Sequence, residues 1–368
     1  MASRRDFLKT AGSVASSAFL LTHAEKILAQ SARREISIDG RRATTIDIHA
    51  HCVFPEVSEI LSGTNFSDVG FAPWQALGPE RIDSMNQRGI DYQALSINRY
   101  WWYGADRALA NDIVRMHDEG MAEWVAEHPD RFVALTSPSL QFPELAAEQL
   151  EYAMNELGHR GASVAGHCNN ESLSEPKYDP FWAKAEELGA PVFMHPNNAQ
   201  NLIREGGFDG RGELGNVIGN PLETSVFLTR LMFDGTLDKF PGLKVVGAHG
   251  GGYLPSYLGR TEVACEVRNN ANCLSMKQPS DYLKDQILVD TMVFSDEALR
   301  HLVAEMGTEQ IVYGTDIPFN WPDTLDLVLD ADFLSSDEKI AIIGGNLAAL
   351  LRIDICLLYT SPSPRDRG

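Results

Sequence analysis

The sequence predicts a single α/β domain built as an eight-stranded (β/α)₈ barrel of the TIM type. Eight short and mostly apolar runs recur along the chain, as expected of strands that are buried on both faces. Patterns typical of helices separate these runs, and such alternation builds a parallel sheet covered by helices. Histidine and aspartate residues recur where several runs end. An open doubly wound sheet is the alternative, but no G-x-G-x-x-G follows the first run, so nothing supports nucleotide binding.

The predicted elements alternate along the whole core of the chain. The expected strands are 44–49, 92–97, 132–137, 162–166, 191–195, 244–249, 286–292 and 310–316. The expected helices are 106–129, 143–158, 179–189, 221–242, 295–307 and 336–353. The segment 143–158 begins with proline and ends at glycine, which is the usual asymmetry of helix ends.

Composition limits the class of protein and its partners. The chain has 368 residues, 44% of them hydrophobic and 22% charged, with a formal net charge of −20. We expect a soluble globular domain without a nucleic-acid partner, because a phosphate backbone would be repelled. No run reaches the roughly 18 apolar residues that a membrane span needs. The five cysteines are scattered without a C-x-x-C, which predicts neither a zinc knuckle nor a disulfide framework.

Both ends of the chain are expected to lie outside the barrel, which would occupy 33–353. Residues 1–32 contain "SRRDFLKTAGSVASSAFLL", in which two arginines precede a short, weakly apolar run. This pattern predicts a twin-arginine signal and export of the folded protein to the periplasm, with an amphipathic helix as the alternative. The composition changes abruptly after the last expected helix, so 354–368 is expected to be an appended, non-native tail.

Two histidines in "TTIDIHAHC" point to a metal site. His49 and His51 are two apart in an expected strand, so their side chains lie on the same face. His195, His249 and Asp316 end the fifth, sixth and eighth strands, and the carboxyl ends of barrel strands form the active face. Imidazoles and a carboxylate are suitable ligands for Zn²⁺ and similar ions. A core histidine at 195 and a barrel-closing hydrogen bond or salt bridge at 316 are the alternatives.

Longer segments resemble a known family over about residues 44–352. The segments "IDIHAH", "PVFMHP", "KFPGLKVVGAHGGGYLPSYLGR" and "VYGTDIPF" resemble the amidohydrolase-related group of the amidohydrolase superfamily, and within it the aminocarboxymuconate-semialdehyde decarboxylase branch. The resemblance implies a barrel of the metal-dependent hydrolase type that forms a homodimer. It also implies one divalent ion, expected to be Zn²⁺ with Mn²⁺ as the alternative. The implied ligands are His49, His51, His195 and Asp316.

The resemblance also implies roles in catalysis and substrate binding. His249 takes the position of the acid/base histidine beside a metal-bound water, and Asp316 is expected to assist in proton transfer. Arg260 matches an arginine that binds the substrate carboxylate across a dimer interface. Phe319 matches an aromatic residue that stacks on the substrate, and His167 in "GHCNN" matches a segment near the pocket.

The chain also departs from the family pattern. The family often carries a carboxylate-binding arginine between the first two strands, where this chain offers only Arg81 on an expected helix. Arg99 is a candidate replacement, with a structural salt bridge as the alternative. A family tryptophan after the fifth strand is missing, since the chain reads "HPNNAQN" there. The aromatic run 100–103 either lines the pocket instead or packs in the core.

These residues favour a metal-dependent decarboxylase that acts on a small aromatic or muconate-type carboxylic acid. A metal-bound water with His249 as acid/base, and an arginine that orients the carboxylate, would supply the chemistry. A metal-dependent hydrolase of a C–C, lactone or amide bond uses the same ligands and is the main alternative. Hydration of an unsaturated acid and a non-catalytic binding protein remain open.

Overall fold

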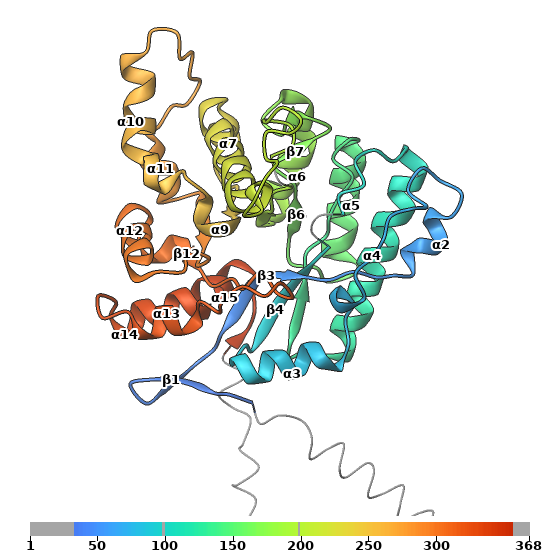
Figure 1. The fold of residues 1–368 in the computed structure, drawn as a ribbon, viewed down its shortest axis with the longest axis horizontal. Coiled ribbons are helices and arrows are strands. Elements are labelled where there is room, and N and C mark those ends of the chain that lie inside the picture. Colours follow the sequence, from blue (N-terminus) through green and yellow to red (C-terminus); the bar gives the residue numbers. More distant parts are fainter. Residues whose placement is uncertain (1–32, 98–99, 198, 356–368) are drawn as a thin grey trace, which may run out of the picture.

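The computed structural model describes residues 33–97, 100–197 and 199–355. The expected signal at 1–32, residue Arg99 and most of the expected tail lie outside the described residues. The described chain forms one barrel with helices around it (Figure 1).

Among the described residues, eight parallel strands form the barrel, and each overlaps one of the expected runs. Their bounds are β3 (Ile46–His51), β4 (Tyr92–Ser96), β5 (Phe132–Ala134), β6 (Ala162–Val164), β9 (Val192–Met194), β10 (Val245–Gly247), β11 (Ile287–Asp290) and β12 (Ile311–Val312). They pair in the orders β3-β4-β5 and β12-β11-β10-β9-β6. Parallel bridges from Ala50 to Ile317 and from Thr136 to Ala162 connect the two sheets into a ring. The predicted (β/α)₈ barrel is confirmed.

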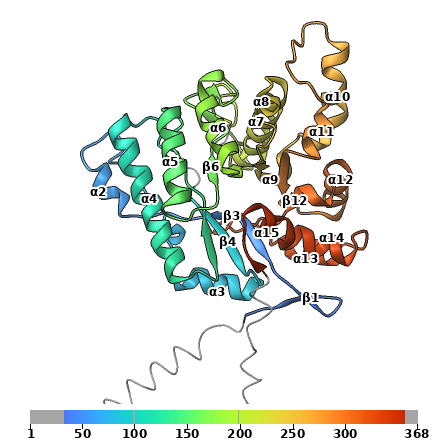
Figure 2. The ribbon, with the colours of Figure 1, turned by 180° about the vertical axis from the view of Figure 1, so that it is seen from behind.

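Helices cover the outside of the ring (Figure 2). The main ones are α2 (Val57–Leu61), α3 (Pro79–Arg88), α4 (Arg107–Glu127), α5 (Pro143–Asn155), α6 (Asp179–Leu188), α7 (Asn220–Phe233), α8 (Thr236–Lys239), α12 (Asp296–Met306), α13 (Leu325–Asp330), α14 (Ser336–Ile340) and α15 (Asn346–Leu350). The single helix expected over 221–242 is two helices, because the chain turns at Gly235, whose φ of 77° suits glycine. No helix among the described residues has the length and apolar character needed to cross a bilayer.

Smaller elements lie outside this regular pattern. β1 (Ile36–Ile38) pairs with β2 (Arg41–Ala43), and β7 (His167–Cys168) pairs with β8 (Glu171–Ser172). The short α9 (Ala248–Gly251) follows β10 directly. Beyond it, α10 (Leu258–Val267) and α11 (Pro279–Leu283) are joined by a loop.

Residues 257–278, which we call the arm, extend beyond the ring of helices (Figures 1 and 2). The arm exposes several large apolar side chains, namely Tyr257, Val263, Val267, Leu274 and Met276. A disulfide joins Cys265 to Cys273 and closes the loop after α10. The sequence predicted no disulfide framework and did not indicate this single pairing, whereas Cys52 and Cys168 are free and buried.

Candidate active site

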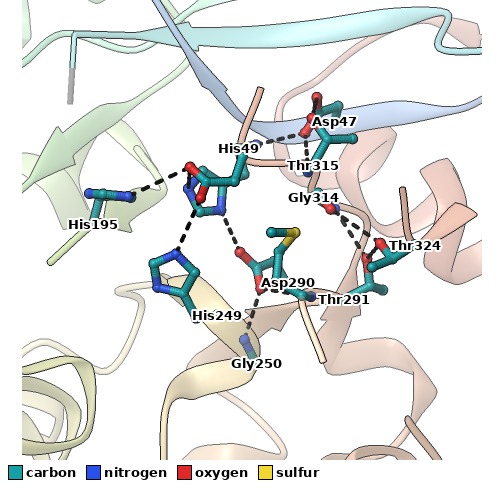
Figure 3. A network of polar contacts seen from close by, with 12 residues as sticks. Asp47, His49, His195, His249, Gly250, Asp290, Thr291, Gly314, Thr315 and Thr324 are labelled. Carbon is teal, nitrogen blue, oxygen red and sulfur yellow. Dashed lines mark hydrogen bonds and ion pairs between the residues drawn. The ribbon is translucent and has the colours of Figure 1, made fainter. Parts of the chain in front are cut away.

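The two histidines of β3 contact an aspartate that follows β12. Figure 3 shows His49 of this pair, with His195, His249 and Asp290 around it. Nε2 of His51 lies 2.7 Å from Oδ1 of Asp316, and Nε2 of His49 lies 3.1 Å from the same oxygen. Both imidazoles are buried. The alternation of side chains along β3 thus directs the two rings to one carboxylate, as the spacing predicts.

Two further histidines approach the same carboxylate from other strands. Nε2 of His195, which follows β9, is 4.0 Å from Oδ1 of Asp316. Nε2 of His249, which follows β10, is 3.7 Å from Oδ2. One donor atom from each of His49, His195, His249 and Asp316 lies within 4.8 Å of the others. The structure therefore brings together all five residues predicted for the metal and for acid/base catalysis.

The backbone at two of these residues is strained. His249 and Asp316 both have a φ of 56°, in the left-handed region that side chains other than glycine rarely adopt. Such strain persists only where the surrounding structure enforces it, and it concentrates at functional sites. The left-handed backbone at the ends of β10 and β12 is thus a local feature that distinguishes these residues from ordinary core positions.

The site favours an ionised carboxylate among imidazoles. Burial raises the pKa of Asp316, but the surrounding histidines outweigh burial and keep this pKa well below the ordinary value. Burial lowers the pKa of His51 to about 4, and burial together with neighbouring imidazoles lowers the pKa of His195. Burial also opposes charge on His49, yet Asp316 and Asp290 together raise the pKa of His49 to about 10.

This donor set fits a divalent cation. Nε2 of His49 is buried and has no hydrogen-bond partner among the described residues, although it faces Asp316. Nε2 atoms from four histidines converge on one ionised carboxylate, and neutral imidazole with carboxylate is a usual ligand combination for zinc, manganese and related ions. Several of these donors can hold one ion: the structure groups His49, His195, His249 and Asp316 within 4.8 Å, whereas the sequence motifs predict His51 in place of His249 as a ligand.

Asp290, at the end of β11, belongs to the site but was missed in the sequence. Its carboxylate accepts hydrogen bonds from Nδ1 of His49 (2.7 Å) and from the backbone N–H groups of Gly250 (2.8 Å) and Met292 (3.1 Å). The bond to Nδ1 fixes the His49 ring with Nε2 toward Asp316. The position of Asp290 at a strand end was the available signal, and the same reasoning that selected Asp316 applies to it.

Asp47 connects β3 to the segment that carries Asp316. Its carboxylate accepts hydrogen bonds from the backbone N–H of His49 (2.9 Å), from Nε2 of Gln93 (2.9 Å) and from Oγ1 of Thr315 (2.7 Å). All four residues are buried. This network stabilises the register between the first and last strands, and so the distance between the β3 histidines and Asp316.

Of the described residues predicted to bind the substrate, only Phe319 lines the cavity at the histidines. Phe319 packs its ring edge-on to His51, with centroids 5.2 Å apart, and lines a cavity of about 180 Å³ together with His195 and Asp316. Arg260 is exposed on α10 and is not among the described residues that line this cavity. Arg99 lies outside the described residues.

The structure also places the other residues whose roles the sequence left open. Arg81 lies on α3, as expected, and donates to the backbone oxygen of His51 (2.6 Å), so it stabilises the end of β3. His167 lies in β7 and lines a second cavity rather than the one at the histidines. The aromatic run 100–103 is buried in the core and also lines this second cavity.

A (β/α)₈ barrel whose strand ends present four histidines and an aspartate to one point defines a class of metal-dependent enzymes. The chain belongs to the amidohydrolase family, whose sequence model matches residues 46–353. The resemblance seen in the sequence motifs is confirmed.

Named relatives of this family are decarboxylases. The chain is 29% identical over 315 residues to 2-amino-3-carboxymuconate-6-semialdehyde decarboxylase of Dictyostelium discoideum, covering 84% of this chain and 85% of that protein. It is 30% identical over 338 residues to gamma-resorcylate decarboxylase of Rhodococcus jostii, covering 84% and 98%. A crystal structure of a dihydroxybenzoic acid decarboxylase from Polaromonas, with bound manganese and the inhibitor 2-nitroresorcinol, superposes with a TM-score of 0.72 at 27% identity, covering 84% and 97%.

Proposed function

We propose that the protein is a metal-dependent decarboxylase of an aromatic or muconate-type carboxylic acid. The observation that carries this proposal is the convergence of His49, His51, His195 and His249 on Asp316 in a chain that is 30% identical to a resorcylate decarboxylase. The cavity beside these side chains is lined by Phe319, whose ring suits a planar substrate.

The bound ion and the side chains around the cavity have separate roles in the reaction. When bound, a divalent ion supplies positive charge that polarises substrate oxygens. His249 is 15% exposed and the other site histidines are at most 8% exposed. Its Nε2 lies 3.7 Å from the carboxylate of Asp316, which lines the cavity, so we assign proton transfer to His249. The bond between the ring carbon and the carboxylate breaks, CO₂ leaves, and the electron pair stays on carbon. A proton from Nε2 of His249 then takes the place of the lost carboxylate, and solvent supplies a new proton to the histidine.

Incubation with a panel of hydroxybenzoates and muconate-type acids tests this function. We expect CO₂ release that depends on added metal. His249→Asn should lower kcat about 10²–10⁴-fold while metal content stays unchanged, because a positioned acid/base contributes about that much. The matched control is His301→Asn, on the exposed side of α12. Acid release from esters, lactones or amides without any CO₂ would instead show a hydrolase.

We propose Zn²⁺ or Mn²⁺ as the ion. Imidazole-rich sites suit zinc, whereas the Polaromonas relative binds manganese. Elemental analysis of protein produced with equal supplies of both metals distinguishes them. In the double variant His49→Ala/His51→Ala the metal should be lost, and full retention would contradict the assigned ligands.

We propose that the active form is a homodimer. Arg260 is exposed on the arm together with several apolar side chains, and the small cavity contains no arginine among its described lining residues. A carboxylate substrate needs a cationic partner, and an arginine from a second copy would provide a planar, two-pronged one.

We propose export to the periplasm by the twin-arginine route. The disulfide between Cys265 and Cys273 supports this proposal, because disulfides persist in oxidising compartments such as the periplasm. Changing Arg4 and Arg5 together to lysine should leave the enzyme in the cytoplasm, as measured by cell fractionation. Unchanged export of this double variant would exclude the route.

A further inference from the structure

A second cavity of about 590 Å³ lies beside the one at the histidines. It is lined by the aromatic run 100–103, by Phe66 and by His167, among others. Asn197 lines both this cavity and the smaller one of about 180 Å³, so the two cavities adjoin at this residue. Ligand pockets usually measure about 300–1,000 Å³. The small cavity alone falls below that range, whereas the aromatic cavity lies within it.

The walls of the aromatic cavity are packed rings. Trp102 stacks on Tyr100 with centroids 5.9 Å apart, and Phe66 packs edge-on to Trp102 at 5.7 Å. Trp101 stacks on Tyr103 at 6.2 Å. Because the rings of residues 100–103 are buried and pack on one another, they form a rigid aromatic wall of the kind that favours a flat, unsaturated group, while amide side chains also line the cavity.

Hydrogen-bond donors without partners accompany these rings. The indole Nε1 atoms of Trp101 and Trp102 are buried and have no partner among the described residues. Nδ1 of His167 accepts a hydrogen bond from the backbone N–H of Asn170 (3.2 Å), which places the ring proton on Nε2. Burial lowers the pKa of His167, so the ring stays neutral, and its Nε2 also lacks a partner. Unsatisfied buried donors are rare and indicate a missing acceptor.

The lack of charged side chains in the described lining limits the class of ligand further. The described lining residues include no aspartate, glutamate, lysine or arginine. A charged group placed there would lose hydration without meeting an opposite charge among the described lining residues. The group that fits is therefore uncharged, aromatic or otherwise unsaturated, and carries an acceptor oxygen such as an ether or a carbonyl.

We propose that the aromatic cavity is a second substrate compartment and that the preferred substrate is a two-ring carboxylic acid. Its acid-bearing ring lies at the histidines and its oxygen-bearing second ring lies against Trp101 and Trp102. This inference rests on the proposed function, since it assumes that the carboxylate binds at the histidine cavity. Asn197 lines both cavities, so the bond that joins the two rings must pass beside this residue.

Binding to the metal-loaded protein tests the compartment independently of turnover. The probes are salicylate and salicylates that carry a 4-methoxyphenyl group on ring carbon 4 or 5, measured by isothermal titration calorimetry. We expect at least one arylated isomer to bind tenfold or more tightly than salicylate. Replacing methoxy by methyl in that isomer should weaken binding several-fold, because the donors lose their acceptor.

Three variants locate the effect. Trp101→Ala should abolish the advantage of the two-ring probe without changing salicylate binding, and Trp101→Phe should abolish only the preference for methoxy over methyl. Gln200→Trp fills the cavity from an exposed lining position and should weaken only the two-ring probe, which covers the case in which Trp101→Ala fails to fold. Trp124→Ala is the matched control, because Trp124 also has an unpartnered Nε1 but lies on α4 and does not line this cavity.

The outcomes separate the two proposals. Equal binding of salicylate and both two-ring isomers overturns the compartment, whatever the CO₂ assay shows. An advantage that survives Trp101→Ala and Gln200→Trp overturns it as well. Tight, Trp101-dependent binding of a two-ring acid without CO₂ release supports the compartment and contradicts only decarboxylation.

Discussion

At the scale of single residues, the surroundings of a buried aspartate decide whether its pKa is lowered or raised. Asp316 faces imidazoles that lower its pKa, and Asp290 accepts from His49 and two backbone N–H groups. Asp118, on α4, is buried without a cation at hydrogen-bond distance, so burial raises the pKa of Asp118 to about 8. The first two aspartates can be inferred from strand ends, whereas nothing in the helical pattern around Asp118 indicates its burial beside Thr136.

Asp290→Asn should weaken metal binding. The carboxamide must turn its NH₂ either toward Nδ1 of His49 or toward the N–H groups of Gly250 and Met292, so one set of hydrogen bonds is lost. We expect the metal affinity to fall about 10–100-fold, as measured by competition with a chelator. Asp285→Asn, at an exposed ion pair with Lys244, is the control. An unchanged affinity would show that Asp290 does not position His49.

Asp118→Asn should change how stability depends on pH. The unfolded carboxyl ionises near pH 3.8 and the folded one near pH 8, so the wild-type protein loses stability as the pH rises through this window. The variant lacks this loss, and its Oδ1 can still accept from Oγ1 of Thr136. Its free energy of unfolding relative to wild type should rise from pH 4 to pH 8 in urea titrations. Parallel profiles would disprove the raised pKa, and Asp112→Asn on the exposed face is the control.

At the scale of elements, α7 fixes the loops that separate the two cavities. Glu223 is buried on α7, and its carboxylate accepts from the backbone N–H groups of Gly166 (3.1 Å), Asn197 (2.9 Å) and Ala199 (2.7 Å). Gly166 is required there, because a Cβ at this residue would lie 2.6 Å from Cγ of Glu223. The helix therefore positions the loops after β6 and β9 through one side chain.

Glu223→Gln should loosen both loops. The carboxamide supplies one acceptor oxygen for N–H groups that now use two, so at least one backbone N–H loses its partner, at a cost of about 1–3 kcal/mol. Hydrogen exchange should accelerate at Gly166, Asn197 and Ala199, and KM should rise more than kcat falls. Glu186→Gln is the control, since Glu186 accepts a single exposed N–H from Gly242. Exchange rates equal to wild type would contradict this role.

Sequence patterns predicted the strands better than the connections. All eight strands were predictable because buried parallel strands are short, apolar runs, although every barrel strand after β3 is shorter than expected. The break between α7 and α8 and the pairing of Cys265 with Cys273 depend on tertiary contacts that periodicity does not report. For the same reason the sequence left open whether residues 100–103 pack in the core or line a cavity.

At the scale of the whole molecule, Arg260 is exposed on the arm and lines neither of the two cavities. The dimer proposal requires that Arg260 serve a second copy. Arg260→Ala and His249→Ala subunits should each be nearly inactive, whereas mixing them should restore activity, because a mixed dimer has one pocket with both residues intact. Arg268→Ala, at the end of α10, is the control that should stay active. No recovery despite demonstrated subunit exchange would exclude a shared site.

The two bridges that close the barrel have a mechanical consequence. The ring consists of a three-strand part, β3 to β5, and a five-strand part, and each seam between the parts is held by one parallel bridge and two or three backbone hydrogen bonds. His49 and His51 belong to the first part, while His195 and Asp316 belong to the second. A bound ion would therefore connect the two parts of the barrel across one seam. The free energy of unfolding should rise by about 2.7 kcal/mol at a free ion concentration of 100 times Kd, and the thermal midpoint should rise with it. Removal of the ion by a chelator should accelerate amide exchange first at His51, whose N–H donates across that seam to the backbone oxygen of Ile317. Uniform acceleration throughout the barrel would show that the ion does not stabilise this seam in particular.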